Sequence, residues 1–420
     1  MGEGCEESGG GLREMSINIL CIPTSVGLSK PITGGQNRFS NIVKQLREKG
    51  NNVIVLESRD FMDLNDKKFG KVYYYTDLKI FSRTLSVFRD VNIDFILKVM
   101  KILKDEKVDI IQISHPSGIF MVNLITKLMR KEIPIAYDAY DAGSNFIMET
   151  FVHDPKYSRL ERLTIPVYIR VIEKIVCKYL TDHITSVSEK EAKIFIELYK
   201  LKKEKITVIP SGCHILELLD TKFKNNVKEK LGIDSDRLII FFHGLYSYLN
   251  NKEGFEAIEN YIAPMFREIN EKVLFVMGGT GAPKFERANT KSLGFIEDLN
   301  EVLAIVDIAI IPLTKGTGTK LKVLDYLGVG LPTVTTKKGI EGIDAKNYEH
   351  AIIVDDINEE FTNAIKYLID NEQERKRIGA NARKLAEEKY DWGKIGEKLD
   401  KLYEKILAKK DVKPYDQLGD

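Results

Sequence analysis

The sequence predicts an α/β fold of two Rossmann-like domains, each a doubly wound parallel sheet, that face one cleft. Two observations support this fold class. Short apolar runs rich in β-branched residues alternate with helical patterns along both halves of the chain, and these runs lack the polar alternation of half-exposed strands. Parallel strands covered by helices on both faces have this composition, and 420 residues are enough for two such sheets.

The first half of the chain begins with a short buried strand at residues 17–22. A helix over residues 36–49 follows, because four apolar side chains recur at helical spacing and Gly50 ends the pattern. A second strand at 53–56 completes a βαβ unit, whose two strands lie parallel. The same alternation predicts strands at 109–113, 133–137, 183–187 and 206–209, a helix at 118–131 and a helix start at Ser188.

The alternation restarts in the second half, after a polar stretch at 221–230. Strands are predicted at 238–243, 273–277, 307–311, 333–335 and 351–354. Helices are predicted near 253–269, 298–305, 319–329 and 358–370, and long amphipathic helices fill the last 45 residues. These patterns divide the chain into a disordered extension at 1–15, a first domain at 16–212, a linker at 213–236, a second domain at 237–388, a final helix at 389–410 that crosses back to the first domain, and a tail at 411–420.

The composition excludes several classes of protein. Hydrophobic residues make up 43% of the chain and charged residues 30%, which is typical of a globular protein. The net charge of +1 argues against a dedicated nucleic-acid-binding protein, although the first 210 residues carry +5 and the remaining 210 carry −4. No uncharged apolar stretch reaches the roughly 18 residues of a membrane span, and the acidic opening lacks the apolar region of a signal peptide.

The cysteines indicate a reducing compartment. No two of them have the C-x-x-C spacing of a zinc site, and they are too dispersed for a disulfide scaffold. We therefore expect a cytoplasmic protein. The four positions are Cys5, Cys21, Cys177 and Cys213.

A glycine-bearing loop, Thr33-Gly34-Gly35, lies between the first strand and the first helix. Two interpretations have about equal weight: the glycines let the backbone approach a phosphate or sugar at the helix N-terminus, or this is an ordinary loop of a βα unit. The G-x-G-x-x-G fingerprint of dinucleotide-binding domains and the Walker A motif are both absent from the chain.

The segment at 312–334 is the richest in candidate chemistry. It runs from a strand end through a Gly/Thr loop into a helix whose start carries Lys320 and Lys322. Cations are disfavoured at this positive helix end, so a bound diphosphate would explain both lysines. Asp325 follows at a position where its carboxylate could accept the hydroxyls of a ribose. The alternative is that all three are ordinary surface residues of a helix.

The segment from Gly316 to Thr336 resembles the donor site of retaining GT-B glycosyltransferases, most closely glycosyltransferase family 4 (glycosyl transferases group 1). Other segments resemble the same family, in the right order, over roughly residues 16–405. They are the glycine loop at 33–35, segments 186–189 and 208–212, segment 242–244 with Asn251, segments 275–279 and 293–296, the Gly339–Ile343 segment and the region of Trp392.

The resemblance implies transfer of a sugar from a nucleotide-diphospho-sugar, UDP- or GDP-linked, to a hydroxyl acceptor with retention of anomeric configuration. The donor would bind the C-terminal domain and the acceptor the N-terminal domain, and no metal or other cofactor is required. The implied donor-binding residues are Gly244, Gly279, Gly294, Phe295, Ile296, Thr317, Gly318, Thr319, Lys320, Lys322 and Asp325. The implied catalytic residues are His115, Tyr140, Asp141 and Lys320, and the acceptor or phosphate loop is Thr33, Gly34 and Gly35.

The sequence also departs from the family pattern. Two glutamates eight positions apart are common in the donor site, and here these positions are Thr317 and Asp325. The common His-Asp pair is replaced by Tyr140-Asp141, and a tyrosine with a pKa near 10 is a poor base at neutral pH. The usual Arg/Lys pair after Gly244 is missing, with Lys252 as a weak substitute, so Lys320 and Lys322 must supply more of the positive charge.

Several alternatives remain open at this stage. A glycan or lipid-linked sugar would serve as acceptor, and an aromatic and basic stretch at 67–89 suits peripheral contact with the cytoplasmic membrane face, although a solvated loop explains that stretch slightly better. His115 fits a site residue and a structural histidine equally. A non-catalytic sugar-nucleotide-binding or partner subunit, and a GT-B epimerase or phosphorylase, are the other functions considered.

Overall fold

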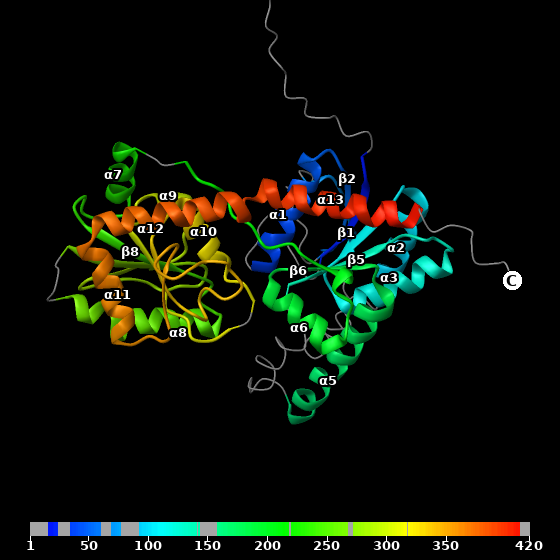
Figure 1. Cartoon of the computed structure of the whole chain (residues 1–420), viewed down its shortest axis with the longest axis horizontal. Coiled ribbons are helices and arrows are strands. Elements are labelled where there is room, and N and C mark those ends of the chain that lie inside the picture. The colour runs from blue at the N-terminus through cyan, green and yellow to red at the C-terminus, as the bar shows by residue number, and fades with distance from the viewer. Residues whose placement is uncertain are drawn as a thin grey trace, which may run out of the picture.

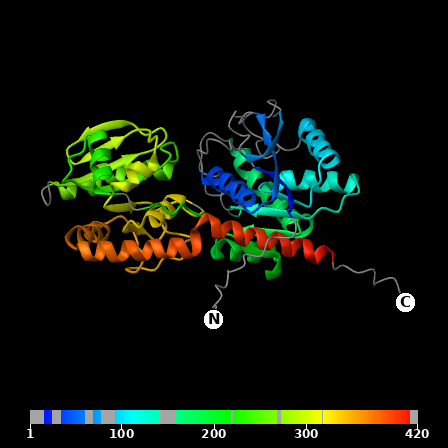
Figure 2. The same ribbon diagram turned by 90° about the horizontal axis from the view of Figure 1, so that it is seen from above.

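The computed structural model describes residues 16–23, 34–59, 69–76, 92–140, 142, 158–217, 220–267, 272–316 and 318–411. Two α/β domains lie side by side, and the final helices run along both of them (Figures 1 and 2). The predicted fold class is therefore confirmed. The predicted extension at 1–15 and nearly all of the predicted tail at 411–420 fall outside the described residues.

The N-terminal domain is built on a seven-stranded sheet in the order β3-β2-β1-β4-β5-β6-β7, and all its pairings are parallel. Its central strands are buried along their whole length, as the uninterrupted apolar runs require. The strands are β1 (Asn18–Ile22), β2 (Asn52–Ser58), β3 (Lys71–Tyr75), β4 (Ile110–Ile113), β5 (Ile135–Ala139), β6 (His183–Ser186) and β7 (Ile206–Val208).

Helices cover both faces of this sheet. One face carries α1 (Gly34–Glu48) and the C-terminal helix α13 (Trp392–Asp411), whose apolar side chains share one core cluster. The other face carries α2 (Ile93–Asp105), α3 (Pro116–Leu128), α5 (Arg159–Ile175) with its π-helical extension η5 (Val176–Leu180), and α6 (Glu189–Tyr199).

The C-terminal domain repeats this plan with the strand order β10-β11-β9-β8-β12-β13-β14. Only the edge strand β10 is antiparallel to its neighbour. The strands are β8 (Leu238–His243), β9 (Val273–Gly278), β10 (Lys284–Arg287), β11 (Thr290–Leu293), β12 (Ile308–Ile311), β13 (Thr333–Thr336) and β14 (Ile352–Val354). The helices are α7 (Thr221–Lys230), α8 (Leu249–Ala257) with η7 (Ile258–Ile262) and η8 (Ala263–Phe266), α9 (Leu299–Ala304), α10 (Leu321–Val329), α11 (Glu359–Asp370) and α12 (Glu372–Leu385).

The chain crosses between the domains twice at one place. Cys213 donates its backbone N–H to the Tyr390 carbonyl at 2.7 Å, and Trp392 donates back to the Cys213 carbonyl at 3.3 Å. The π-helical turn η9 (Ala386–Tyr390) ends α12 there, and α13 then packs on α1. Asn51 fixes the far end of this contact by donating to the Asp400 carboxylate at 2.7 Å.

Some elements differ from the sequence prediction. The interval predicted as a linker, residues 213–236, contains α7, which Asp220 caps by accepting the Phe223 N–H and which packs against α9. The hairpin β10–β11 and the helices α2 and α5 were not predicted. No helix among the described residues is long and apolar enough to cross a membrane.

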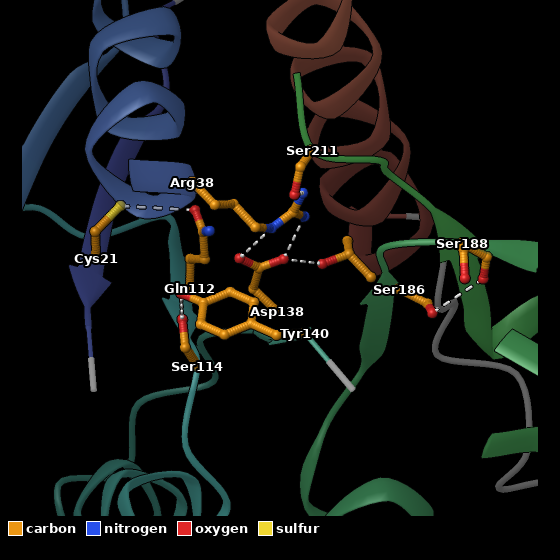
Figure 3. Close-up of polar contacts among 10 residues, drawn as sticks. Cys21, Arg38, Gln112, Ser114, Asp138, Tyr140, Ser186, Ser188 and Ser211 are labelled. Atoms are coloured by element: carbon orange, nitrogen blue, oxygen red, sulfur yellow. Dashed lines mark hydrogen bonds and ion pairs between the residues drawn. The ribbon is translucent and has the colours of Figure 1, made fainter. Parts of the chain in front are cut away.

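A buried ion pair attaches the start of α1 to the sheet (Figure 3). Arg38 and Asp138 are only 1% and 2% exposed, and their side chains approach to 2.8 Å between Nη2 and Oδ1. Arg38 also donates to the Ser211 hydroxyl at 3.4 Å, and Thr185 donates to Asp138 at 2.7 Å. The pair therefore joins α1, β5, β6 and the segment that leaves the N-terminal domain.

We predict that Asp138→Asn lowers the free energy of unfolding by about 3 kcal/mol, because it leaves the Arg38 guanidinium buried without its counterion. Urea unfolding followed by the fluorescence of Trp392, the single tryptophan of the chain, measures the change. The control is Glu397→Gln, which removes an exposed ion pair with Lys401 and should leave the urea midpoint in place. Equal midpoints for the two variants would contradict the prediction.

Candidate functional site

The carboxyl ends of β8 and β12 form the switch point of the C-terminal sheet and are its candidate ligand site. The chain leaves these neighbouring strands in opposite directions, toward β9 on one side and β13 on the other. Ligands of open parallel sheets bind at such a switch point, beyond the carboxyl ends of the strands. Gly244 follows β8 there, and the loop at 312–316 and 318–320 connects β12 to α10.

Lys322 lies in the first turn of α10, and its side chain reaches the end of β8. Its ammonium donates to the Asn251 side-chain oxygen at 2.7 Å and lies 4.3 Å from the centre of the Phe242 ring. Asn251 is fixed in turn by donating to the Leu245 carbonyl at 2.9 Å. A Cβ atom at Gly244 would lie 2.7 Å from the lysine nitrogen, so the glycine provides the space for the ammonium.

Burial changes the titration of two groups at this switch point. It lowers the pKa of Lys322 to about 7, to which the nearby Lys320 charge also contributes. Burial likewise raises the pKa of Asp325, one turn further along α10, to about 7, while the Lys322 charge acts in the opposite direction. Each group lacks enough opposite charge to offset its desolvation, which is a common property of ligand-binding sites.

His243, the last residue of β8, faces Asp325 with its Nε2 atom 4.0 Å from Oδ2. The Tyr326 hydroxyl accepts the His243 backbone N–H at 3.2 Å and lies 2.9 Å from Nδ1. In the tautomer whose proton lies on Nε2, the Tyr326 hydroxyl donates its own proton to Nδ1. Burial lowers the pKa of His243 to about 3, so the ring is neutral near pH 7, with Nε2 toward Asp325.

Lys320 has a different surrounding from Lys322. It occupies the N-cap position of α10, and its ammonium donates to the carbonyls of Gly316 and Gly318 at 3.1 and 2.7 Å. Lys320 therefore stabilises the conformation of its own loop. Next to it, the Thr319 hydroxyl is buried and has no hydrogen-bond partner among the described residues. A ligand oxygen at the start of α10 would satisfy it.

Three predicted donor-site glycines lie together. Gly279 donates its N–H to the Gly294 carbonyl at 2.8 Å, and a Cβ atom at Gly279 would lie 2.2 Å from the Gly244 carbonyl oxygen. Ile296 packs against the end of β9, whereas the Phe295 ring is 66% exposed. The exposed ring beside this glycine cluster is suited to stacking on a base.

The N-terminal domain contributes a second group of predicted residues. Gly34 and Gly35 open α1, and a Cβ atom at Gly35 would lie 3.0 Å from the Tyr140 ring. The Tyr140 hydroxyl donates to the Ser114 hydroxyl at 3.1 Å. The Nδ1 atom of the next residue, His115, lies 2.6 Å from the Ser117 hydroxyl oxygen. Burial, together with the nearby Asp138 charge, raises the pKa of Tyr140, so this residue is no base at neutral pH.

The two groups meet across the domain interface. A Cβ atom at Gly34 would lie 3.4 Å from the Leu321 side chain, so the starts of α1 and α10 touch. At Gly342, a Cβ atom would contact Thr319 at 2.7 Å and Ser188, the N-cap of α6, at 3.5 Å. An ion pair between Lys190 and Glu341 spans the interface nearby. A cavity of about 520 Å³ is lined by residues of both domains at this edge.

Not every predicted site residue is brought into these groups. Thr33, Asp141 and Thr317 lie outside the described residues, so their predicted roles stay predictions. The structure adds His243 and Tyr326, which sequence reasoning missed as site residues. The available signal was a histidine at the end of an apolar strand, which also fits a structural histidine.

This arrangement can bind an anion and a pair of hydroxyl groups. The starts of α1 and α10 have no acidic residue in their first turns, so both helix ends remain positive toward the cleft. Lys322 and the Thr319 hydroxyl can add hydrogen bonds to a diphosphate, and Asp325 can accept two hydroxyls. No cluster of three or more His, Cys, Asp or Glu side chains suited to a metal ion occurs within the described ranges.

The family comparisons agree with this geometry. Residues 32–215 match the family described as Glycosyltransferase Family 4, and residues 237–371 match that described as Glycosyl transferases group 1. Both halves of the chain are glycosyltransferase domains. Together they form a GT-B fold.

Among relatives, an uncharacterized glycosyltransferase of Methanocaldococcus jannaschii is 24% identical over 254 residues. That match covers 57% of this chain and 62% of the relative, less than two thirds of its length.

Solved structures extend the similarity of fold over nearly the whole chain. Anabaena HepE in complex with UDP has a TM-score of 0.68 and 16% identity, covering 93% of this chain and 100% of HepE. Sucrose-phosphate synthase from Thermosynechococcus elongatus has a TM-score of 0.67 and 14% identity, covering 94% of this chain and 100% of the synthase. WaaG, a glycosyltransferase involved in lipopolysaccharide biosynthesis, has a TM-score of 0.67 and 16% identity, with 91% and 99% covered.

We predict that Gly279→Ala disrupts the glycine cluster far more than Gly281→Ala does. Both glycines have positive φ, +143° and +77°, but a Cβ atom at Gly281 meets nothing closer than 4.0 Å. Gly279→Ala adds a collision with the Gly244 backbone and should cost at least about 2 kcal/mol more in unfolding free energy than the control. Thermal melting of both variants measures this, and equal losses of stability would contradict the close contact.

Proposed function

We propose that the protein transfers a sugar from a nucleotide-diphospho-sugar to a hydroxyl group of a glycan or lipid-linked sugar, with retention of anomeric configuration. The observation that carries the proposal is the partly buried Lys322 ammonium at the start of α10, which donates to Asn251 and whose pKa is lowered by burial to about 7. Such a site gains most from a ligand that brings two negative charges to the positive helix end. A nucleoside diphosphate is that ligand, and it is also the leaving group of the transfer.

The same site suggests how the reaction proceeds. The bond between the sugar and the diphosphate breaks while the acceptor oxygen attacks from the same side, and Lys322 with the ends of α1 and α10 stabilises the charge on the departing diphosphate. Since the raised pKa of Tyr140 prevents it from acting as a base, the acceptor proton passes to a donor phosphate oxygen. The role proposed for Tyr140 is then to hydrogen-bond the substrate without exchanging a proton.

The structural neighbours favour a uridine nucleotide among the two leading donors. Structures of HepE, which has a similar fold, contain UDP and UDP-glucose. We extend this to the present chain as part of the proposal, together with independence from metal ions. The proposed location is the cytoplasm, with the N-terminal domain against the membrane; the buried free thiols of Cys21, Cys177 and Cys213 fit a reducing compartment.

A panel of UDP, GDP, ADP, TDP and CMP, each with and without magnesium, tests the donor site by thermal shift. One nucleoside diphosphate should raise the melting temperature without magnesium. A ligand at about one hundred times its Kd stabilises the folded state by roughly 2.7 kcal/mol. Lys322→Met should weaken that nucleotide by about 1–3 kcal/mol through loss of charge-assisted hydrogen bonds. The control is Lys315→Ala, a lysine of the same loop that is exposed and paired with Glu253.

Two outcomes would redirect the interpretation. If no nucleotide shifts the melting temperature, the donor site is wrong. If a nucleotide binds but its sugar derivative is neither hydrolysed nor transferred to any acceptor, the chain is a sugar-nucleotide-binding partner subunit. The engagement of Lys320 with its own loop is the observation that favours this second function.

We further predict that nucleotide affinity is highest near pH 7. Binding of the diphosphate requires protonated Lys322, whose empty-site pKa is about 7, so affinity falls as the pH rises above 7. Binding of the ribose requires ionised Asp325, whose pKa is also about 7, so affinity falls as the pH drops below 7. Calorimetric titration between about pH 5.5 and pH 9 measures both limbs, each approaching tenfold per pH unit.

Two variants separate the limbs of this profile. Lys322→Arg keeps its charge at every accessible pH and should remove the alkaline limb, whereas Asp325→Asn should remove the acidic limb at a lower maximum affinity. A profile that stays unchanged in both variants would mean that neither group controls binding.

A further inference from the structure

Three neighbouring helices of the N-terminal domain expose apolar side chains on their outer sides. These helices, α2, α3 and α5, cover one face of the sheet and contact one another in that order (Figure 1). Their inner sides fill the core, and their outer sides are apolar as well, which is unusual for helices on a domain surface. The exposed residues are Ile93, Leu97 and Met100 on α2, Phe120, Leu124 and Leu128 on α3, and Leu163, Val167 and Val171 on α5.

The nine side chains form stripes and are not scattered. On each helix they recur three or four positions apart, so they lie above one another along one side. Each is between 40% and 73% exposed. An apolar surface that spans three adjacent helices exceeds what single exposed residues produce and marks an interaction surface. We call it the outer helical face.

Cations continue the stripes of the outer helical face. They lie three or four positions from its apolar residues and are exposed; they are Lys101 and Lys104 on α2, Lys127 on α3, and Arg159, Arg170 and Lys174 on α5.

Only three carboxylates with described side chains lie on these helices, against the six cations, and one of the three is buried away from the surface. Asp94 accepts the Thr76 N–H, Asp105 pairs with Lys101, and Glu173 is buried against two tyrosine hydroxyls. The face is therefore both apolar and positively charged.

We propose that the outer helical face docks on the surface of a lipid bilayer that contains anionic lipids. This inference rests on the membrane contact in the proposed function and identifies the surface that makes it. The apolar side chains would enter the region between headgroups and acyl chains while the lysine and arginine side chains reach the phosphates. An anionic bilayer offers both kinds of partner over an area as wide as three helices.

Charge argues against a second copy of the chain as the occupant. In a symmetric dimer through this face, the same cations would oppose one another, and like charges across an interface destabilise it. An apolar patch without charge would fit another copy equally well. The cations beside the stripes favour an anionic occupant.

The test is co-sedimentation of the full-length chain with vesicles. The protein should bind vesicles of an equimolar mixture of phosphatidylcholine and phosphatidylglycerol, bind less as salt is raised, and bind poorly to phosphatidylcholine alone. Failure to bind the anionic vesicles would overturn the proposal.

Two triple variants separate the apolar from the charged contribution. Ile93→Gln with Leu128→Gln and Leu163→Gln, one exposed residue per helix, should weaken binding at least about tenfold. Lys104→Gln with Lys127→Gln and Arg170→Gln should weaken it about a hundredfold on anionic vesicles. The matched control is Tyr261→Gln with Met265→Gln and Tyr348→Gln, three exposed residues of the C-terminal domain.

The remaining outcomes have distinct meanings. A control variant that loses binding as much as the apolar variant would overturn the proposed face. A dimer in sedimentation velocity that the apolar variant converts to monomer would show that the face joins two copies, which also overturns it. The nucleotide-induced thermal shift should be equal in all variants; its absence from the wild-type chain would contradict the donor site and leave the vesicle result unaffected.

Discussion

The desolvated ammonium of Lys322 is the constraint on which the candidate site depends. An ammonium loses hydration when it is buried, and the Asn251 oxygen and the Phe242 ring replace only part of it. The glycine cluster around Gly244 and helix α10 surround the ammonium. The absence of a side chain at Gly244 leaves space for it, but no carboxylate pairs with it among the described contacts. A bound anion would complete the balance, which is why the site is better explained by a ligand than by stability.

Much of the fold could be predicted because parallel strands have a strong sequence signal. Runs such as those at 109–113 and 238–243 are short, mostly apolar and rich in β-branched or aromatic residues, and they alternate with longer helical patterns, as buried parallel strands do. The hairpin β10–β11 was missed because it lies at a sheet edge with exposed charged residues. Helix α7 was missed because its residues are mostly polar, and its position depends on tertiary contact of Val227 with the domain core.

Sequence reasoning placed the candidate donor residues near one another, but it did not predict which contacts each of them makes. Spacing placed Lys320 and Lys322 together, yet one residue precedes the first helical turn and the other lies within it. Lys320 has extended backbone angles, and its side chain turns back onto the loop, whereas the side chain of Lys322 contacts Asn251. The contribution of Tyr326, on α10, depends on the His243 ring at the end of β8, and such pairing between a helix and a distant strand has no local sequence signal.

The contact between the two domains brings positive helix ends close to Lys322, and the lowered pKa of Lys322 reduces the repulsion between them. The starts of α1 and α10 touch through Gly34 and Leu321, and neither first turn contains an acid. Two positive helix ends and a fully charged lysine would repel one another in an empty cleft. Near neutral pH the lysine can release its proton, which lowers that repulsion. If a diphosphate binds as proposed, it would restore the proton and contact both domains. Donor binding, protonation of Lys322 and contact between the domains would then be thermodynamically linked.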